Sequence, residues 1–318
     1  APVNIASGGT ASFTHPTQWN PATSGTYTIE AWASNNNGNP DQNTSNDKIT
    51  FQVDVVDTVV TRVTCMEVFT SSTCGPCVPG NQNMDNNVVP NISNYTIVKY
   101  QQNFPGAGDP YYTTESVNRR GYYGINSIPR MEIDGQWDKN ADSLTTGVFN
   151  DYQQQPAFMT IDTTNANYTG TTATINATIT PHINYAAGNY RYHVIINEKR
   201  TTGNVATNGE TQFFHVMMDM IPNETGNAIS SLTKGVAIPV TKVQNLSSSN
   251  VEEMSDLEVV VLVQDNGDKK ILQSAKKDIS LAQGIADIDS DSEGIASLYP
   301  HPANNNATIK YQVDVAKN

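Results

Sequence analysis

The sequence has few cysteines, few basic residues and no long apolar run. Only 3 of its 318 residues are cysteine, too few for a small fold held together by disulfides. Lysine and arginine number 18 against 31 acidic residues, which gives a net charge of −13 and excludes a basic surface for nucleic acid. No stretch approaches the roughly 20 apolar residues that cross a bilayer. The abundant asparagine, threonine, serine and glycine suit a β-rich secreted or cell-surface protein of about two to three domains.

Residues 1–57 carry strand patterns. Polar and apolar residues alternate over 26–32 and again over 49–55, and the polar tract 35–47 separates them. So few strands cannot close a sandwich. We therefore expect these strands either to pack against a neighbouring domain or to complete a domain whose N-terminal portion is missing. The segment resembles the end of a cell-adhesion-related bacterial domain, which implies a partial immunoglobulin-like β-sandwich.

Residues 58–154 alternate strand and helix patterns. The predicted strands and helices follow one another along the chain as strand 63–69, helix 78–89, strand 95–100, helix 109–124, strand 128–133 and helix 143–152. Asp109 and Pro110 form a good helix start, because a capping carboxylate precedes a proline. This alternation predicts an α/β layer.

Residues 155–283 return to strand patterns. Apolar and polar residues alternate over 173–179 and 190–196, and Leu257–Val263 is nearly all apolar. Strands separated by turn residues, without helical periodicity, predict a β-sandwich.

An acidic linker is predicted at 284–294. Its four carboxylates between 287 and 293 have the spacing of a calcium loop, but Gly294 is out of place and no bidentate glutamate follows. The polar tract 35–47 is a second place where calcium could bind. We expect a solvated linker and a plain turn, and therefore no cofactor, with calcium as the alternative.

Cys74 and Cys77 flank Gly75 and Pro76 where a predicted strand leads into a helix. This spacing lets one sulfur attack a substrate disulfide while the other resolves the mixed disulfide. The helix N-terminus favours the thiolate of the first cysteine. Zinc would need two further ligands, and Cys65 with scattered histidines does not supply them. The alternative is a static disulfide, which an isolated pair in a secreted protein also predicts.

The Cys-Gly-Pro-Cys loop after an apolar strand, with an Ile-Pro pair ahead of a later strand, resembles the thioredoxin fold. The resemblance implies that Cys74 is the attacking thiol, Cys77 the resolving thiol and Pro129 a cis proline opposite them. Glu67 is the candidate for the family's proton-relaying strand carboxylate, although it lies one position too far from Cys74. Residues 104–112 are expected to be an insertion.

The whole layout resembles the Omp-twenty-eight-related outer-membrane proteins of Bacteroidetes. The loop 70–74 and the stretch 213–222, followed by Gly226 and Gly235, carry this resemblance. It implies a multi-domain α+β chain, in which a thioredoxin-like α/β domain is flanked by immunoglobulin-like β-sandwich modules. It also implies an extracellular, outer-membrane-associated location.

Residues 295–318 contain Tyr-Pro-His-Pro at 299–302 and then a strand pattern. This resembles the start of the type A sorting domain of type IX secretion, which implies the secretion machinery as a partner. We expect a secreted surface protein whose dithiol acts on or binds other surface or secreted proteins, with thiol–disulfide oxidoreductase as the candidate enzyme class. The alternative is a non-enzymatic surface, adhesion or assembly component with a structural disulfide. Neither a nucleic-acid partner nor a transmembrane segment is expected.

Overall fold

The computed structural model describes residues 5, 8–32, 43–282, 294–299 and 308–312, which belong to two compact units, Ala1–Thr58 and Val59–Asn318. The first unit contains the antiparallel strands β1 (Gly25–Trp32) and β2 (Lys48–Val55), with Ile29 opposite Phe51. Both strands lie where the sequence predicts them. On β2, Ile49 is 62% and Phe51 is 47% exposed, so these two large apolar side chains are not buried within the described part of this unit.

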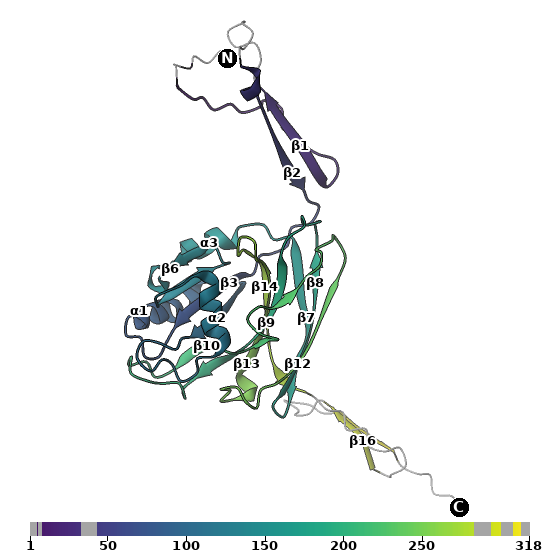
Figure 1. The fold of residues 1–318 in the computed structure, drawn as a ribbon. Helices are drawn as coiled ribbons and strands as arrows, with labels where there is room; N and C mark the ends of the chain where they lie inside the picture. Colours follow the sequence, from purple (N-terminus) through teal and green to yellow (C-terminus); the bar gives the residue numbers. More distant parts are fainter. Residues whose placement is uncertain (1–4, 6–7, 33–42, 283–293, 300–307, 313–318) are drawn as a thin grey trace, which may run out of the picture. The chain divides into compact units, whose positions relative to one another are not determined.

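In the second unit, residues 59–282 are built on two β-sheets (Figure 1). The larger has nine strands in the order β14-β13-β9-β10-β4-β3-β5-β6, with β11 beside β9, and the smaller has the order β12-β8-β7-β15. The strands of the larger sheet are β3 (Thr64–Thr70), β4 (Tyr95–Gln101), β5 (Arg130–Ile133), β6 (Trp137–Lys139), β9 (Tyr190–Thr201), β10 (Phe213–Ile221), β11 (Asn227–Ala228), β13 (Leu257–Asp265) and β14 (Ile271–Asp278). Those of the smaller sheet are β7 (Met159–Thr169), β8 (Thr172–Pro181), β12 (Ile238–Asn245) and β15 (Ser280–Leu281).

The helices of this unit are α1 (Cys77–Gln82), which continues into a π-helical turn (Asn83–Val88), α2 (Thr114–Tyr123) and α3 (Thr146–Gln153). The start of α2 differs from the predicted one at Asp109. Thr113 caps the helix instead, because its hydroxyl accepts from the backbone N–H of Ser116 while the Ser116 hydroxyl accepts from Thr113. Gly124 then ends the helix with φ of 76°. The described part of the chain is therefore mainly β-sheet with a few helices, an α+β fold.

Three of the four apolar clusters among the described residues lie between successive layers. Alternation along β3 sends Met66 and Val68 to the core that α3 and the end of the α1 segment share, and Phe69 to the opposite face. That second core joins β3 and β4 to β9, β13 and α2. The third core fills the space between β9 and β13 on one side and β7, β8 and β12 on the other.

One continuous sheet crosses the boundary that the sequence analysis placed between 58–154 and 155–283. Strand β10 runs parallel to β4, with Val216 opposite Lys99, and thereby joins the α/β layer to the strands of the β-sandwich. The two segments form one compact unit, whereas the sequence predicts separate domains. The reason is physical, since pairing between strands more than a hundred residues apart leaves no local pattern in the sequence.

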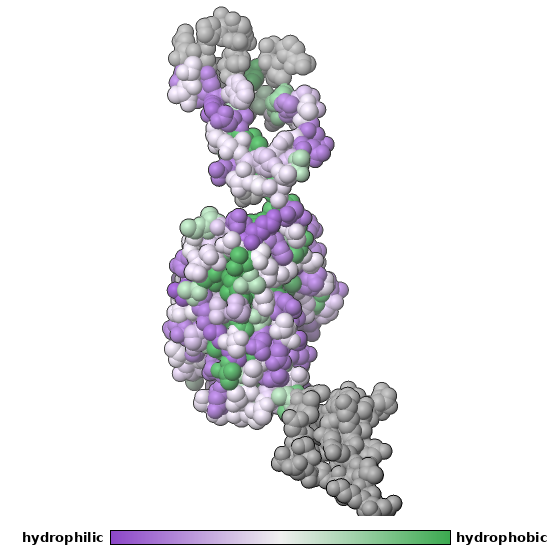
Figure 2. All heavy atoms as spheres, turned by 90° about the vertical axis from the view of Figure 1, so that its right-hand side faces the viewer, coloured by the Kyte–Doolittle hydropathy of each residue, from purple (hydrophilic) through white to green (hydrophobic). Residues whose placement is uncertain are grey.

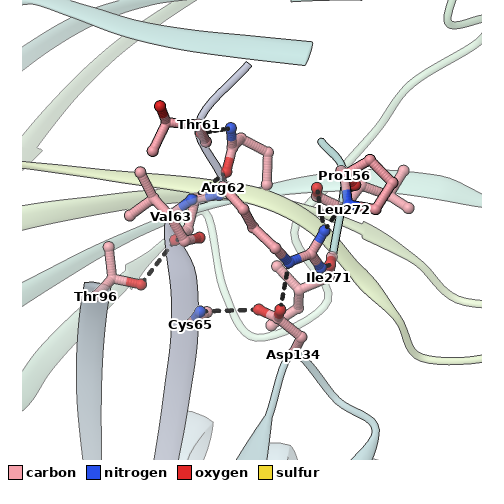
Figure 3. Close-up of polar contacts among 11 residues, drawn as sticks. Thr61, Arg62, Val63, Cys65, Thr96, Asp134, Pro156, Ile271 and Leu272 are labelled. Atoms are coloured by element: carbon pink, nitrogen blue, oxygen red, sulfur yellow. Dashed lines mark hydrogen bonds and ion pairs between the residues drawn. The ribbon is translucent and has the colours of Figure 1, made fainter. Parts of the chain in front are cut away.

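A buried polar network holds the α/β layer against β14 (Figure 3). The Arg62 guanidinium donates through Nε to the Asp134 carboxylate at 2.8 Å and through Nη2 to the carbonyl oxygen of Ile271 at 2.7 Å. The other oxygen of Asp134 accepts from the backbone N–H of Cys65 at 2.8 Å. Both partners of this ion pair have 2% exposed side chains, so the charge of each depends on the other.

The strand β8 shows how the smaller sheet is oriented. Its buried residues alternate with half-buried ones along its whole length, as the sequence predicts for a strand with one face on the core. Figure 2 views the molecule from the side on which this sheet lies, where hydrophobic residues form separate areas among hydrophilic ones. Among the described residues, no helix has the length and apolar character needed to cross a membrane.

The last described strands are β16 (Gly294–Tyr299) and β17 (Thr308–Gln312), which pair antiparallel with each other. Most of the predicted acidic linker and the Pro-His-Pro residues of the predicted sorting segment lie outside the described residues.

Candidate functional site: the Cys74–Cys77 disulfide

Cys74 and Cys77 form a disulfide with a Cα–Cα distance of 5.3 Å. Cys77 is the first residue of α1, and its backbone N–H donates to the carbonyl oxygen of Cys74 at 3.1 Å. Gly75 and Pro76 between them are exposed, but Cys74 is only 2% exposed and Cys77 is fully buried. A reaction partner would therefore meet the intervening Gly-Pro backbone before it meets either sulfur.

The connection from β4 to α2 holds one side of the residues that lead into Cys74. The buried carboxylate of Asp109 accepts from the backbone N–H of Ser72 at 2.9 Å, and the Thr73 hydroxyl donates to the carbonyl oxygen of Pro105 at 2.7 Å. Burial raises the pKa of Asp109, and the N–H groups that it accepts from oppose that rise. The segment expected to be an insertion thus braces the cysteine loop.

The connection from β9 to β10 holds the other side. The backbone N–H of Asn208 donates to the carbonyl oxygen of Ser72 at 2.9 Å, and its side-chain amide donates to Glu210 at 2.6 Å. Two connections from distant parts of the chain therefore meet at the same short loop. Sequence analysis missed both contacts, since nothing in the motif itself identifies its neighbours.

A polar cluster lies on the side of the sheet that faces α1. The Asn81 amide donates to both carboxylate oxygens of Glu210, at 3.1 and 3.0 Å, and to the Thr70 hydroxyl at 3.2 Å. Because Asn81 follows Cys77 by four residues, the two share one face of the helix. Burial raises the pKa of Glu210, and hydrogen bonds from Asn81 and Asn208 partly oppose this. Glu210 is thus a half-buried carboxyl group that contacts helix α1 through Asn81.

Pro129 follows a cis peptide bond with Ile128 and is half-buried. The pairing of β3 with β5 begins at Phe69 opposite Arg130. Since the strands are antiparallel, Pro129 lies at the end of β3 from which the cysteine loop departs. The backbone therefore brings the proline and the disulfide to the same edge of the sheet.

Glu67 lies on the other face of β3 from α1. Its carboxylate accepts from Arg119 at 2.7 and 3.0 Å and from the Tyr100 hydroxyl at 2.8 Å, and it also accepts from the Tyr123 hydroxyl. Its neighbours Met66 and Val68 point the other way, toward the core shared with α3 and the end of the α1 segment. Glu67 is fully buried in a cluster that joins β3 to α2, and among the described residues none of its hydrogen-bond partners belongs to the cysteine loop.

Cys65 is a free thiol that lies in the same apolar core as Phe69. It is fully buried, and burial together with the nearby Glu67 raises its pKa well above the ordinary value. Cys65 is therefore a poor nucleophile in the folded chain. Within the described ranges, no group of three or more histidine, cysteine, aspartate or glutamate side chains is arranged to hold a metal ion.

Comparison with known proteins gives a likeness of fold. No family model and no curated protein matches the chain. Among solved structures, HBP35 of Porphyromonas gingivalis aligns over 80% of this chain and 86% of its own, with a TM-score of 0.56 and 12% identity. A domain of the outer-membrane lipoprotein Omp28 from the same organism covers 40% of this chain and 92% of its own, with a TM-score of 0.28 and 12% identity. Protein AGR_C_4864 from Agrobacterium tumefaciens covers 68% of this chain and 94% of its own, with a TM-score of 0.47 and 16% identity. The chain shares its fold with HBP35.

Proposed function

We propose that this chain is a thiol–disulfide exchange protein whose redox centre is the Cys74–Cys77 pair. The observation that carries the proposal is the position of the disulfide. It joins Cys74, in the loop that follows β3, to Cys77, the first residue of α1. The order β3-α1-β4-α2-β5-β6-α3, with β3 between a parallel β4 and an antiparallel β5, supports a thioredoxin-like layer around it. In this proposal Pro129 faces the pair at the edge of the sheet.

The disulfide is the oxidised form of the centre, so the first half-reaction needs only a substrate dithiol. A substrate thiolate attacks the Cys74 sulfur, the Cys74–Cys77 bond breaks, and the Cys77 thiolate leaves and takes up a proton. The second substrate thiolate then attacks the mixed disulfide and releases the Cys74 thiolate. The substrate is oxidised by two electrons and the cysteine pair is reduced by two. The reverse direction reduces a substrate disulfide.

A second candidate function rests on the burial of both sulfurs. At 2% and 0% exposure, neither cysteine is open to a protein substrate without movement of the loop. A structural disulfide in a non-enzymatic surface, adhesion or assembly component accounts for this burial directly.

Reduction of insulin by dithiothreitol, followed as turbidity, tests the exchange activity. We expect the chain to accelerate it. In the variant Cys77→Ser, the Cys74 thiolate should attack disulfide-bearing proteins and accumulate as mixed disulfides, because the resolving thiol is missing. The matched control is Cys74→Ser, which leaves the fully buried Cys77 as the only thiol of the pair. The double variant leaves only Cys65 and should trap nothing.

Two results would favour the structural disulfide instead. One is insulin reduction at the uncatalysed rate together with no Cys74-dependent adducts. The other is a reduction potential of the pair below about −300 mV, where structural disulfides of secreted proteins lie.

The surface setting is part of the same proposal. A relation to the Omp-twenty-eight-related proteins, an immunoglobulin-like identity for the β7–β14 sandwich, and the type IX sorting segment together suggest an outer-surface location and surface or secreted protein partners. Export of a chain that ends at Gly284 is the test. Retention of that truncated chain inside the cell, with the Val59–Ala282 part still folded, would support the sorting role, and normal surface delivery would contradict it.

A further inference from the structure

A pocket lies apart from the disulfide, where helix α2 meets the first residues of β9. Its volume is about 290 Å³, the lower end of the range of small-molecule sites. Helix α2, the start of β9, the β10–β11 connection and the β13–β14 turn form its walls. The lining residues are Asn118, Arg119, Tyr122, Arg191, His193, Glu224, Thr225 and Asn266.

His193 is the unusual member of this lining. It is 1% exposed, and neither of its ring nitrogens has a hydrogen-bond partner among the described residues. Burial and the positive charges of Arg119 and Arg191 lower its pKa, so the ring is neutral and offers one N–H donor and one acceptor. The backbone of Gly226 packs on the ring, where a Cβ would come within 2.7 Å of His193. A buried imidazole without partners, on the wall of a pocket, is a group prepared for a ligand.

The pocket is also lined by one cation, Arg191, and one anion, Glu224, that form no ion pair with each other. Arg119 is neutralised by Glu67, with which it makes two hydrogen bonds. Among the described residues, the Arg191 guanidinium donates only to backbone carbonyl oxygens, those of Thr225 at 3.0 Å and Gly226 at 3.5 Å. Glu224 accepts from the Asn118 amide at 2.9 Å. In the described part of the chain, neither Arg191 nor Glu224 makes a salt bridge.

We propose that this pocket binds a small zwitterion of the free α-amino acid class. Its carboxylate pairs with the Arg191 guanidinium, its ammonium pairs with Glu224, and its polar body reaches His193. A guanidinium–carboxylate pair gives the geometric selectivity that a lone ammonium does not. The Tyr122 ring, whose hydroxyl donates to Asn266 at 3.0 Å, supplies an aromatic wall for the ligand. This site is independent of the Cys74–Cys77 proposal.

Isothermal titration of the full chain with L-alanine, L-serine, L-glutamate and L-lysine tests the proposal. We expect saturable binding of at least one of these, with propionate and ethylamine, which lack one charge each, binding at least about tenfold more weakly. Arg191→Gln and Glu224→Gln should each weaken binding by about tenfold or more. Arg200→Gln is the matched control, since this second arginine of β9 donates to Gln212 and does not line the pocket.

Three outcomes would overturn the proposal. The first is no heat of binding with any of the four amino acids at about 10 mM, a concentration that reveals even millimolar affinity. The second is propionate binding as tightly as L-alanine, which would indicate a simple anion site. The third is unchanged affinity in Arg191→Gln while its melting temperature equals that of Arg200→Gln.

Discussion

Replacing Glu67 by glutamine separates the two roles that this residue can have. The sequence analysis gave it a proton-relay role for the cysteine pair, which remains a prediction. Its contacts give it a structural role, since four hydrogen bonds from Arg119, Tyr100 and Tyr123 converge on a fully buried carboxylate. We expect Glu67→Gln to lower stability strongly and to leave the redox properties of the folded chain unchanged.

The size of the expected loss of stability follows from the buried Arg119 charge that the variant leaves without a partner. The side chain of Arg119 is 1% exposed, and the variant removes the only anion paired with it among the described residues. Breaking a buried ion pair on one side costs about 3–5 kcal/mol. In a unit of this size each kcal/mol lowers the melting temperature by about 2–4 °C, so a fall of about 10 °C is expected. The double variant Glu67→Leu/Arg119→Met removes both charges and should recover most of the loss.

The assay combines thermal denaturation with the reduction potential of the cysteine pair against a glutathione buffer, and with the pH profile of insulin reduction well below the melting temperature. A structural Glu67 moves only the first measurement. An unchanged melting temperature together with a shifted pH profile would refute the structural reasoning and restore the relay. Recovery of stability in the double variant, with the wild-type potential, would complete the case.

Two other buried carboxylates give simpler expectations. Glu132 lies directly opposite Glu67 on β3 and Asp138 on β6, and burial with these like charges raises its pKa from 4.5 to about 8. Between these two pH values the native state holds a proton that the unfolded state has lost, so the free energy of unfolding falls as the pH rises from about 4.5 to about 8. Glu132→Gln should flatten this dependence. In urea denaturation near pH 8, the variant should be more stable than the wild type by about 1–3 kcal/mol. Asp134→Asn should cost about 3 kcal/mol, because Arg62 loses its buried partner. A melting temperature equal to that of the wild type would contradict the last expectation.

The strands could be predicted where one local pattern decides them. Alternation of period two gives β8 and both strands of the first unit, because each has one apolar face. The same alternation also predicts the face of β3 on which Glu67 lies. A residue directly before Val68 must face the opposite side of β3, so the extra position between Glu67 and Cys74 already places its carboxylate away from α1. A shift of one position along a strand therefore moves a side chain to the other face of the sheet as well as farther from the motif.

The surroundings of the cysteine pair could not be predicted in this way. Asp109 and Glu210 lie 35 and more than 130 residues from Cys74, yet both reach its loop or its helix through hydrogen bonds to Ser72 and Asn81. Those contacts depend on β10 joining β4 in one sheet, which is a long-range pairing. A Cys-Gly-Pro-Cys motif supplies the two sulfurs and their spacing. Access to Cys74 and the charge near Cys77 depend instead on two connections that the motif does not contain, so the same four residues on another scaffold would not have the same reactivity.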